Sequence, residues 1–359
     1  MNTRTTGTAV TLFISAAVAL AGCGTPSTAG GSDGDATADG GGRVDGDLAA
    51  VCEAAEGEGT VVFWGSEENA TQDKLNADFA ATYPGIDVEF QSLRPEEITQ
   101  RLVLESGASR SSEVDVVEGN LDAFAPLVER ELIDTEVDWA ALGVRESLIT
   151  DSNMIRKNRI ANGLVYNPEV TDVEDLPETW EELIDPRWEG TVVVDPRGNP
   201  LQSLAVEWGV DGAVDYVQRL KDTVKPVVIE GGTAGMLTVA SGENQLTTNG
   251  RSAETLEQQA QGSPLEIHYL DVIPTSDFYQ VVPADAPHPN AAACLAGWQV
   301  SEEGLAKALE YAYKHNDDVP PGAPEGAVIA TIETPEELEA SVEAASQMSE
   351  IWASVGASQ

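Results

Sequence analysis

Five loops of the sequence carry small polar residues where an α/β protein would bind a ligand. Each follows a predicted strand, so each lies beyond the carboxyl end of that strand, where helix N-termini present unpaired N–H groups. Ser, Thr and Asn side chains can hydrogen-bond a ligand there, and Gly allows close backbone approach. The same residue types are common in ordinary turns and helix caps, but their shared position favours a site. The predicted ligand-binding residues are Ser66, Glu67, Asn120, Arg197, Asn199, Gly232, Thr233, Asn249 and Arg251.

Arg197 and Arg251 give the predicted site its charge chemistry. Their planar guanidinium groups could bind a carboxylate, phosphate or phosphonate through paired hydrogen bonds. Alternatively, each arginine could pair with a neighbouring acid of this acidic chain, and the sequence leaves both alternatives open. From these residues we expect a small organic anion as ligand.

No catalytic constellation accompanies these loops. His268, His288 and His315 are the only histidines, and none has the spacing of a His-Glu-x-x-His metal site. The sequence contains no Gly-x-Ser-x-Gly nucleophile motif, no Gly-Lys-Ser/Thr phosphate loop and no dinucleotide-binding Gly-x-Gly-x-x-Gly. We therefore expect neither an enzyme nor a bound cofactor.

The elements that must position the loops alternate between strands and helices, which predicts two doubly wound parallel sheets of the α/β class. The C-terminal helix has a capping box, with Thr334 as cap and Glu337 three residues later. The predicted strands are residues 59–64, 86–90, 114–117, 190–194, 226–229 and 245–248. The predicted helices lie around residues 75–83, 95–107, 180–184, 201–220 and 234–240, after residue 290 and from residue 334.

The N-terminus reads as an export signal. After Arg4, the apolar residues 9–19 are too few to span a membrane as a stable helix but suit the core of a secretion signal. Residues 20–23, Leu-Ala-Gly-Cys, resemble the lipobox of bacterial lipoproteins. That resemblance implies cleavage after residue 22, a diacylglycerol on Cys23 and anchoring on the outer face of the cell membrane. The alternative is a plain secretory signal with a coincidental cysteine.

Composition limits the partners further. The net charge of −43 makes nucleic acid and anionic membrane surfaces unsuitable. Because the acids are spread along the whole chain, we interpret them as an adaptation to salty surroundings rather than as a cation site. Apart from Cys23, the chain has two cysteines, Cys52 and Cys294. They could form a disulfide or stay as two separate buried thiols, and the sequence leaves both alternatives open.

Three segments resemble the ferric-iron-type family of solute-binding proteins from bacterial ABC importers. These segments are residues 165–168, 180–190 and 286–304, and the resemblance covers roughly residues 58–330. It implies a type 2 periplasmic binding fold, in which two lobes close on a small solute by a hinge motion and deliver it to a permease driven by an ATPase. We expect a monomer. The expected division is a signal peptide (1–22), a lipidated Cys and disordered tether (23–46), lobe 1 (47–160), lobe 2 (161–274), a return to lobe 1 and hinge (275–330) and a C-terminal helix (331–359).

The chain departs from this family where iron would bind. Iron-binding members share a histidine after the first strand, a glutamate after the third and a tyrosine pair in lobe two. The matching positions here are Glu67, Asn120 or its neighbour Glu118, and residues 249–251, which contain no tyrosine. Ferric iron prefers anionic oxygen ligands, so iron or an iron complex is the second candidate, with Glu67, Glu118 and Asp195 as its carboxylates. A sensory lipoprotein of the same fold and a secreted enzyme on this scaffold are alternatives of other classes.

Overall fold

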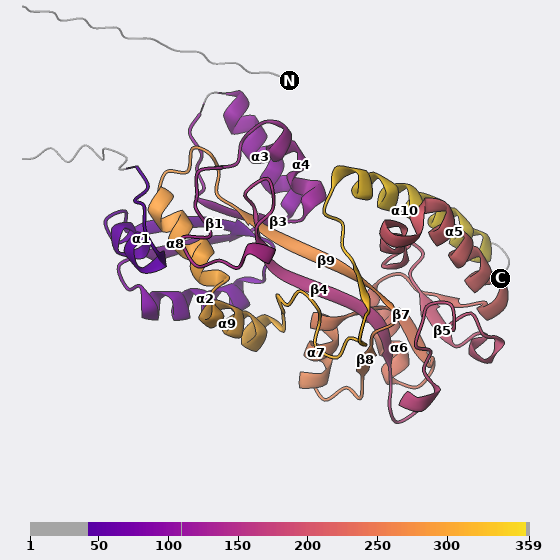
Figure 1. Cartoon of the computed structure of the whole chain (residues 1–359). Coiled ribbons are helices and arrows are strands. Elements are labelled where there is room, and N and C mark those ends of the chain that lie inside the picture. The colour runs from indigo at the N-terminus through magenta and orange to yellow at the C-terminus, as the bar shows by residue number, and fades with distance from the viewer. Residues whose placement is uncertain (1–41, 109, 357–359) are drawn as a thin grey trace, which may run out of the picture. The chain divides into compact units, whose positions relative to one another are not determined.

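The computed structural model describes residues 42–108 and 110–356, whose arrangement is given in Figure 1. The predicted signal peptide, Cys23 and most of the predicted tether lie outside the described residues. Within the described ranges, no helix combines the length and the apolar character needed to cross a membrane.

Within these described residues, ten strands form one sheet in the order β2-β1-β3-β9-β4-β7-β5-β6, with β10 paired to β9 and β8 paired to β4. The strands are β1 Thr60–Gly65, β2 Asp87–Ser92, β3 Val116–Gly119, β4 Ile155–Tyr166, β5 Val192–Val194, β6 Val227–Val228, β7 Leu246–Arg251, β8 Glu266–His268, β9 Val272–Val281 and β10 Val328–Ala330. The α-helices are α1 Leu48–Ala55, α2 Asn69–Thr82, α3 Pro95–Gly107, α4 Leu121–Glu129, α5 Ala205–Val224, α6 Gly232–Ala240, α7 Ser252–Ala260, α8 Pro289–Gln299, α9 Glu302–Ala312 and α10 Pro335–Gly356.

Two groups of parallel strands make up the halves of the sheet. β1 is parallel to β2 and β3 in the first half, and β5 is parallel to β6 and β7 in the second half. The predicted α/β class with two doubly wound halves is confirmed. The predicted lobe boundaries stay a prediction.

The centre of the sheet differs from the expected parallel arrangement. β9 is antiparallel to both β3 and β4, and β4 is antiparallel to β7. Figure 1 shows β4 and β9 as two long neighbouring strands that join the halves. The pairing register of β4 with β9 shifts between Arg156 and Asn158, so an extra residue changes which β4 side chains face each side. The predicted strands are parallel within each half, and the antiparallel centre is formed by β4 and β9, which were not among the predicted strands.

Helices cover both faces of the first half of the sheet. Successive side chains of β1 point in opposite directions, so each face of this strand packs against a different set of helices. Phe63 packs in a cluster with residues of α1, α2 and α8, whereas Trp64 packs with residues of α3 and α4. Cys52 of α1 and Cys294 of α8 form a disulfide inside the first of these clusters, with their Cα atoms 5.0 Å apart. Of the two alternatives for these cysteines, the structure has the bridged one.

The second half is built around α5 and α10, which pack against each other. Tyr216 and Trp352 of these helices share a core cluster with Trp180. α10 begins with the predicted capping box, in which the N–H of Glu337 donates to Thr334 Oγ1 (3.2 Å) and the N–H of Thr334 donates to the Glu337 carboxylate (2.9 Å).

The helix predicted at residues 180–184 is wrong, because this segment forms turns. Trp180 is fully buried, and its indole N–H donates to the carbonyl of Val272 at 2.7 Å. A five-residue segment gains too few helical hydrogen bonds to offset the entropy of starting a helix, so anchoring the indole prevails. Every other predicted strand and helix corresponds to an element of the structure.

Candidate ligand-binding site

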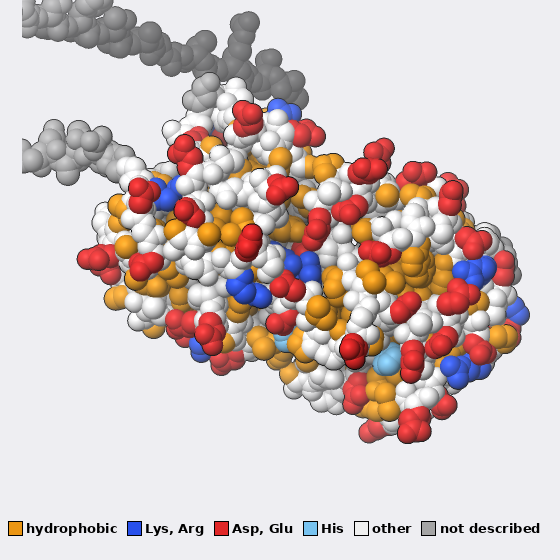
Figure 2. All heavy atoms as spheres, in the orientation of Figure 1, with side chains coloured by type: hydrophobic (Ala, Val, Ile, Leu, Met, Phe, Trp, Pro, Cys, Tyr) orange, Lys and Arg blue, Asp and Glu red, His pale blue; other side chains and the backbone are white. Residues whose placement is uncertain are grey.

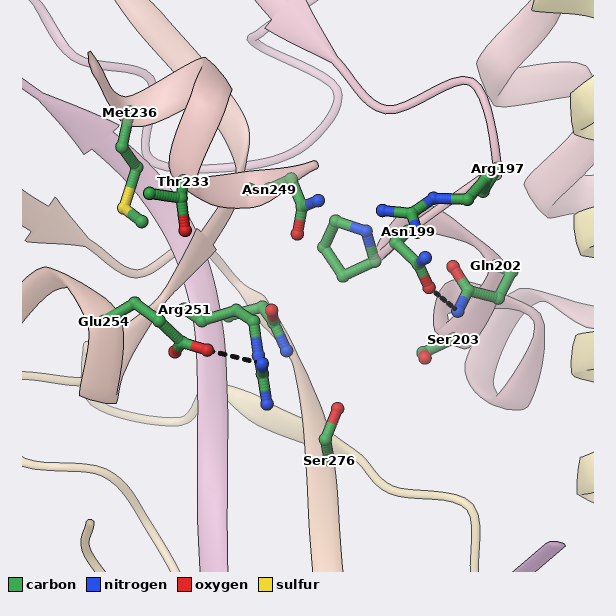
Figure 3. Close-up of a pocket in the computed structure, with 13 residues that line it drawn as sticks. Arg197, Asn199, Gln202, Ser203, Thr233, Met236, Asn249, Arg251, Glu254 and Ser276 are labelled. Atoms are coloured by element: carbon green, nitrogen blue, oxygen red, sulfur yellow. Dashed lines mark hydrogen bonds and ion pairs between the residues drawn. The ribbon is translucent and has the colours of Figure 1, made fainter. Parts of the chain in front are cut away.

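Six of the nine predicted ligand residues line one cavity of about 270 Å³ in the second half of the sheet. They come from the loop after β5, the start of α6 and the end of β7. Figure 3 shows side chains from these loops arranged around a common space. The structure thus brings together Arg197, Asn199, Gly232, Thr233, Asn249 and Arg251. The cavity is also lined by residues that were not predicted: Asn162, Pro200, Gln202, Ser203, Met236, Glu254 and Ser276.

The carboxylate of Asp195 holds the three loops in place. Its side chain is fully buried and accepts five hydrogen bonds. Arg197 donates three of them, from its backbone N–H (2.9 Å), Nε (3.0 Å) and Nη2 (2.7 Å). The other two come from the backbone N–H of Gly231 and the side-chain amide of Asn249, each at 3.0 Å. One carboxylate therefore connects the ends of β5, β6 and β7.

Those hydrogen bonds keep Asp195 ionised. Burial alone would raise its pKa, but the hydrogen bonds from Arg197 and Gly231 outweigh that effect and hold the pKa below its usual value. Every one of these donors binds the charged carboxylate more strongly than the protonated acid, so the arrangement of the loops and the ionisation of Asp195 support each other.

The start of α6 supplies backbone donors to the cavity. Gly231 precedes the helix with a φ of 94°, a left-handed conformation that favours glycine. A Cβ on Gly232 would lie 3.0 Å from the carbonyl oxygen of Asn249, so only glycine fits there without displacement. Gly232 and Thr233 both line the cavity, and the first N–H groups of a helix lack intrahelical partners. The helix end therefore presents a partial positive charge to the cavity.

Both arginines pair with nearby acids, yet both keep donors for a ligand. Arg197 engages Asp195 through Nε and Nη2, which leaves Nη1 without a partner among the described residues. Arg251 donates from Nη1 to Glu254, and its Nε and Nη2 lack a partner in the same ranges. Figure 3 shows the Arg251–Glu254 contact at the cavity edge. Ion pairing and ligand binding are thus compatible here.

A second cavity, of about 260 Å³, shares Arg251 and Glu254 with the first. It is also lined by Glu67, from the loop after β1, and by Lys314, from the segment after α9. The ammonium of Lys314 donates to the Glu67 carboxylate at 2.7 Å. Lys314 was not predicted, because it follows a helix rather than a strand end.

Glu118 lies fully buried at the end of β3 and forms an ion pair with Lys157 of β4 at 2.6 Å. Burial opposes its ionisation, but the positive charges of Lys157 and Lys314 prevail and lower its pKa. All three carboxylates proposed for iron, those of Glu67, Glu118 and Asp195, are therefore already bound to basic groups. In the described parts of the chain, no group of three or more His, Cys, Asp or Glu side chains is placed to hold a metal ion.

Two predicted residues of the first half line neither cavity. Ser66 is exposed, and its hydroxyl donates to Glu118 at 3.5 Å. Asn120 caps α4 by position, but its side chain makes no capping hydrogen bond. Their roles as ligand residues stay predictions.

Comparison with known proteins gives matches in sequence family and in fold. The family described as bacterial extracellular solute-binding protein matches residues 64–306. No curated protein sequence compared with the chain matches it.

Three solved structures illustrate the similarity in fold. Iron-bound HitA from Pseudomonas aeruginosa has a TM-score of 0.63 and 20% identity, over 81% of this chain and 99% of that chain. The ferric binding protein from Campylobacter jejuni has a TM-score of 0.62 and 14% identity, over 81% and 99%. AfuA from Actinobacillus pleuropneumoniae, with exogenous fructose-6-phosphate bound, has a TM-score of 0.58 and 18% identity, over 82% and 98%. At these identities the likeness shows the type 2 periplasmic binding fold and not the ligand.

The role of Asp195 predicts a pH-dependent effect of Asp195→Asn. A lowered pKa stabilises the fold above the usual value of 3.8, and this contribution is lost as the pH falls through the folded-state pKa. At neutral pH we expect the variant to lose about 1–3 kcal/mol in free energy of unfolding. The difference from wild type should shrink below about pH 4. Urea unfolding at several pH values measures it.

Asp211→Asn is the matched control, since Asp211 is an exposed acid on α5 in the same half. It should change stability little at any pH. A difference for Asp195→Asn that stays constant from neutral to acid pH would contradict the assignment of a lowered pKa.

Proposed function

The chain belongs to the bacterial extracellular solute-binding protein family, and on this premise we propose that it captures a small organic anion for an ABC importer. The family binds solutes rather than transforming them, which agrees with the expectation of a non-enzymatic protein. Delivery of the solute to a permease with its ATPase is the role that the family resemblance implies.

The observation that carries the proposed ligand class is the set of donors around the first cavity. Arg197, Arg251 and the start of α6 line the same space, and a carboxylate, phosphate ester or phosphonate could accept hydrogen bonds from all three. The hydroxyl groups of Thr233 and Ser203 and the side-chain amides of the asparagine and glutamine residues complete a lining suited to a polar solute.

The charge of the rest of the molecule does not exclude an anion. Figure 2 shows acidic side chains across the visible face and far fewer basic ones. At physiological ionic strength, however, the Debye length is about 8 Å, so distant surface acids act weakly on the cavity. Binding therefore depends on the donors that line the cavity. At the cavity, the positive charges of the two arginines neutralise the negative charges of Asp195 and Glu254.

Ferric iron, free or complexed, is the second candidate. It is supported by the likeness in fold to proteins described as iron-binding. Against it stand the paired carboxylates and the absence of tyrosine at residues 249–251. Iron would therefore need a bound anion to supply ligands that this chain lacks.

We also propose that Cys23 carries the lipid anchor, on the strength of residues 20–23 alone. Cells supplied with labelled palmitate should label the wild-type chain, whereas Cys23→Ser should stay unlabelled. Equal labelling of both would contradict the proposal. The alternative to a role in import is that of a sensory lipoprotein with the same fold.

Arg251→Ala tests the ligand site. Thermal shift assays of the full chain with fructose 6-phosphate, citrate, ferric citrate and ferric nitrilotriacetate should find stabilisation by an organic phosphate or carboxylate. Because hydrogen bonds to charged groups contribute about 1.5–3 kcal/mol, Arg251→Ala should weaken that ligand by about 10- to 100-fold in calorimetry.

Arg219→Ala is the control, since this exposed arginine of α5 pairs with the surface acids Glu181 and Asp215 and lines neither of these two cavities. It should bind like wild type. Unchanged affinity in Arg251→Ala would remove Arg251 from the site, and stabilisation by ferric nitrilotriacetate alone would favour iron.

A further inference from the structure

A third cavity, of about 440 Å³, lies on the other side of β9 from the ligand site. Ser276 and Phe278 of β9 line the first and second cavities, whereas Tyr279 lines this one. Side chains at adjacent positions of a strand point to opposite faces of the sheet. The third cavity shares no lining residue with the other two, and its volume falls within the range of small-molecule sites.

The walls of this cavity are mainly apolar and its rim is acidic. The apolar walls come from α4, the segment leading into β4 and the start of α10, and include Leu121, Ala125, Val128, Met154, Pro335 and Leu338. The exposed acids of the rim are Glu129, Glu146, Asp151 and Glu333.

Arg156 is the one basic side chain in this lining, and it is already engaged. Its Nε donates to Asn316 Oδ1 at 2.9 Å, and its Nη2 forms an ion pair with Asp318 at 2.5 Å. The rim acids therefore have no free counter-charge in the cavity.

Tyr279 provides a second, independent sign of a ligand. It is 4% exposed and lines the cavity, yet its hydroxyl has no hydrogen-bond partner among the described residues. Burial and the nearby carboxylates of Asp277 and Glu333 outweigh the opposing charges of Arg156 and Arg159 and raise the pKa of Tyr279. The hydroxyl therefore stays protonated, and its oxygen can accept a hydrogen bond. The hydroxyl is therefore available to accept a hydrogen bond from a molecule in this cavity.

We propose that this cavity is a second binding site, which takes a compact apolar amine. The ammonium group lies on the rim side of the cavity, where it donates to the Tyr279 hydroxyl and is attracted by the rim acids. The apolar body lies against α4 and the start of α10. An anion is disfavoured by the rim acids, and a neutral analogue lacks their attraction.

The test compares three probes of equal size: para-fluorobenzylamine, para-fluorobenzyl alcohol and para-fluorobenzoate. Each is titrated into the full chain by fluorine NMR in about 0.15 M salt, where non-specific surface attraction is screened. The amine should bind saturably with a Kd near or below about 1 mM, the alcohol more weakly and the benzoate least.

Two variants locate the binding. Tyr279→Phe removes only the hydroxyl and should weaken the amine by about threefold to tenfold, the worth of one hydrogen bond. Ala125→Phe fills the cavity from α4 and should weaken the amine at least about tenfold. Glu325→Gln removes an exposed acid outside the cavity lining and should have no effect.

The proposal is overturned if the amine does not saturate, if the three probes bind equally, or if Glu325→Gln weakens the amine as much as the cavity variants do. Because Tyr279→Phe preserves the shape of the side chain, unchanged amine affinity in that variant would also overturn it, even if Ala125→Phe failed to fold.

Discussion

The proposed ligand site depends on a single buried carboxylate, that of Asp195. The loops after three parallel strands meet at one edge of the sheet by topology, but their polar groups also need a partner there. Asp195 provides that partner with five hydrogen bonds. It also fixes the guanidinium of Arg197, whose Nη1 has no partner in the part of the chain that the structure describes. An acid under an anion site is unexpected by charge alone. The acid has a structural role, because it holds an arginine and the start of a helix in a fixed orientation before a ligand binds.

Buried charges recur at the centre of the sheet. Lys157 pairs with Glu118, and Arg159 donates to both oxygens of Asp277 at 2.8 and 2.6 Å. Removing either partner would leave an unpaired charge in the interior, which costs far more than a surface pair contributes. These pairs also bear on the ligand, because a carboxylate that neutralises a lysine is a poor ligand for ferric iron.

Much of the fold could be predicted locally, and its centre could not. The apolar run of residues 61–64 and the capping box at Thr334 depend on neighbours in the sequence, so both were found. β4 contains the run Arg156-Lys157-Asn158-Arg159, which is typical of an exposed loop because such residues are rarely buried unpaired. Their partners lie far along the chain, 39 residues away for Lys157 and 118 for Arg159. Only the folded chain shows that the charges cancel.

The residues of the candidate site could likewise be predicted only in part from the sequence. Loops at the ends of parallel strands share one edge of a sheet by topology, which is why six of the predicted residues line one cavity in the second half. Asn162 and Ser276 were missed because they belong to the antiparallel crossing strands, and Lys314 because it follows a helix. Nothing local to these residues distinguishes them from other polar positions. Their roles come from long-range pairing.

Native mass spectrometry with metal analysis tests the central claim most directly, on the full chain purified without chelator. The account predicts one small organic anion per chain, released on denaturation, with iron well below one per chain. One iron per chain with no organic anion would contradict it, because carboxylates that are bound to Lys157, Lys314 and Arg197 would then have to be the metal ligands.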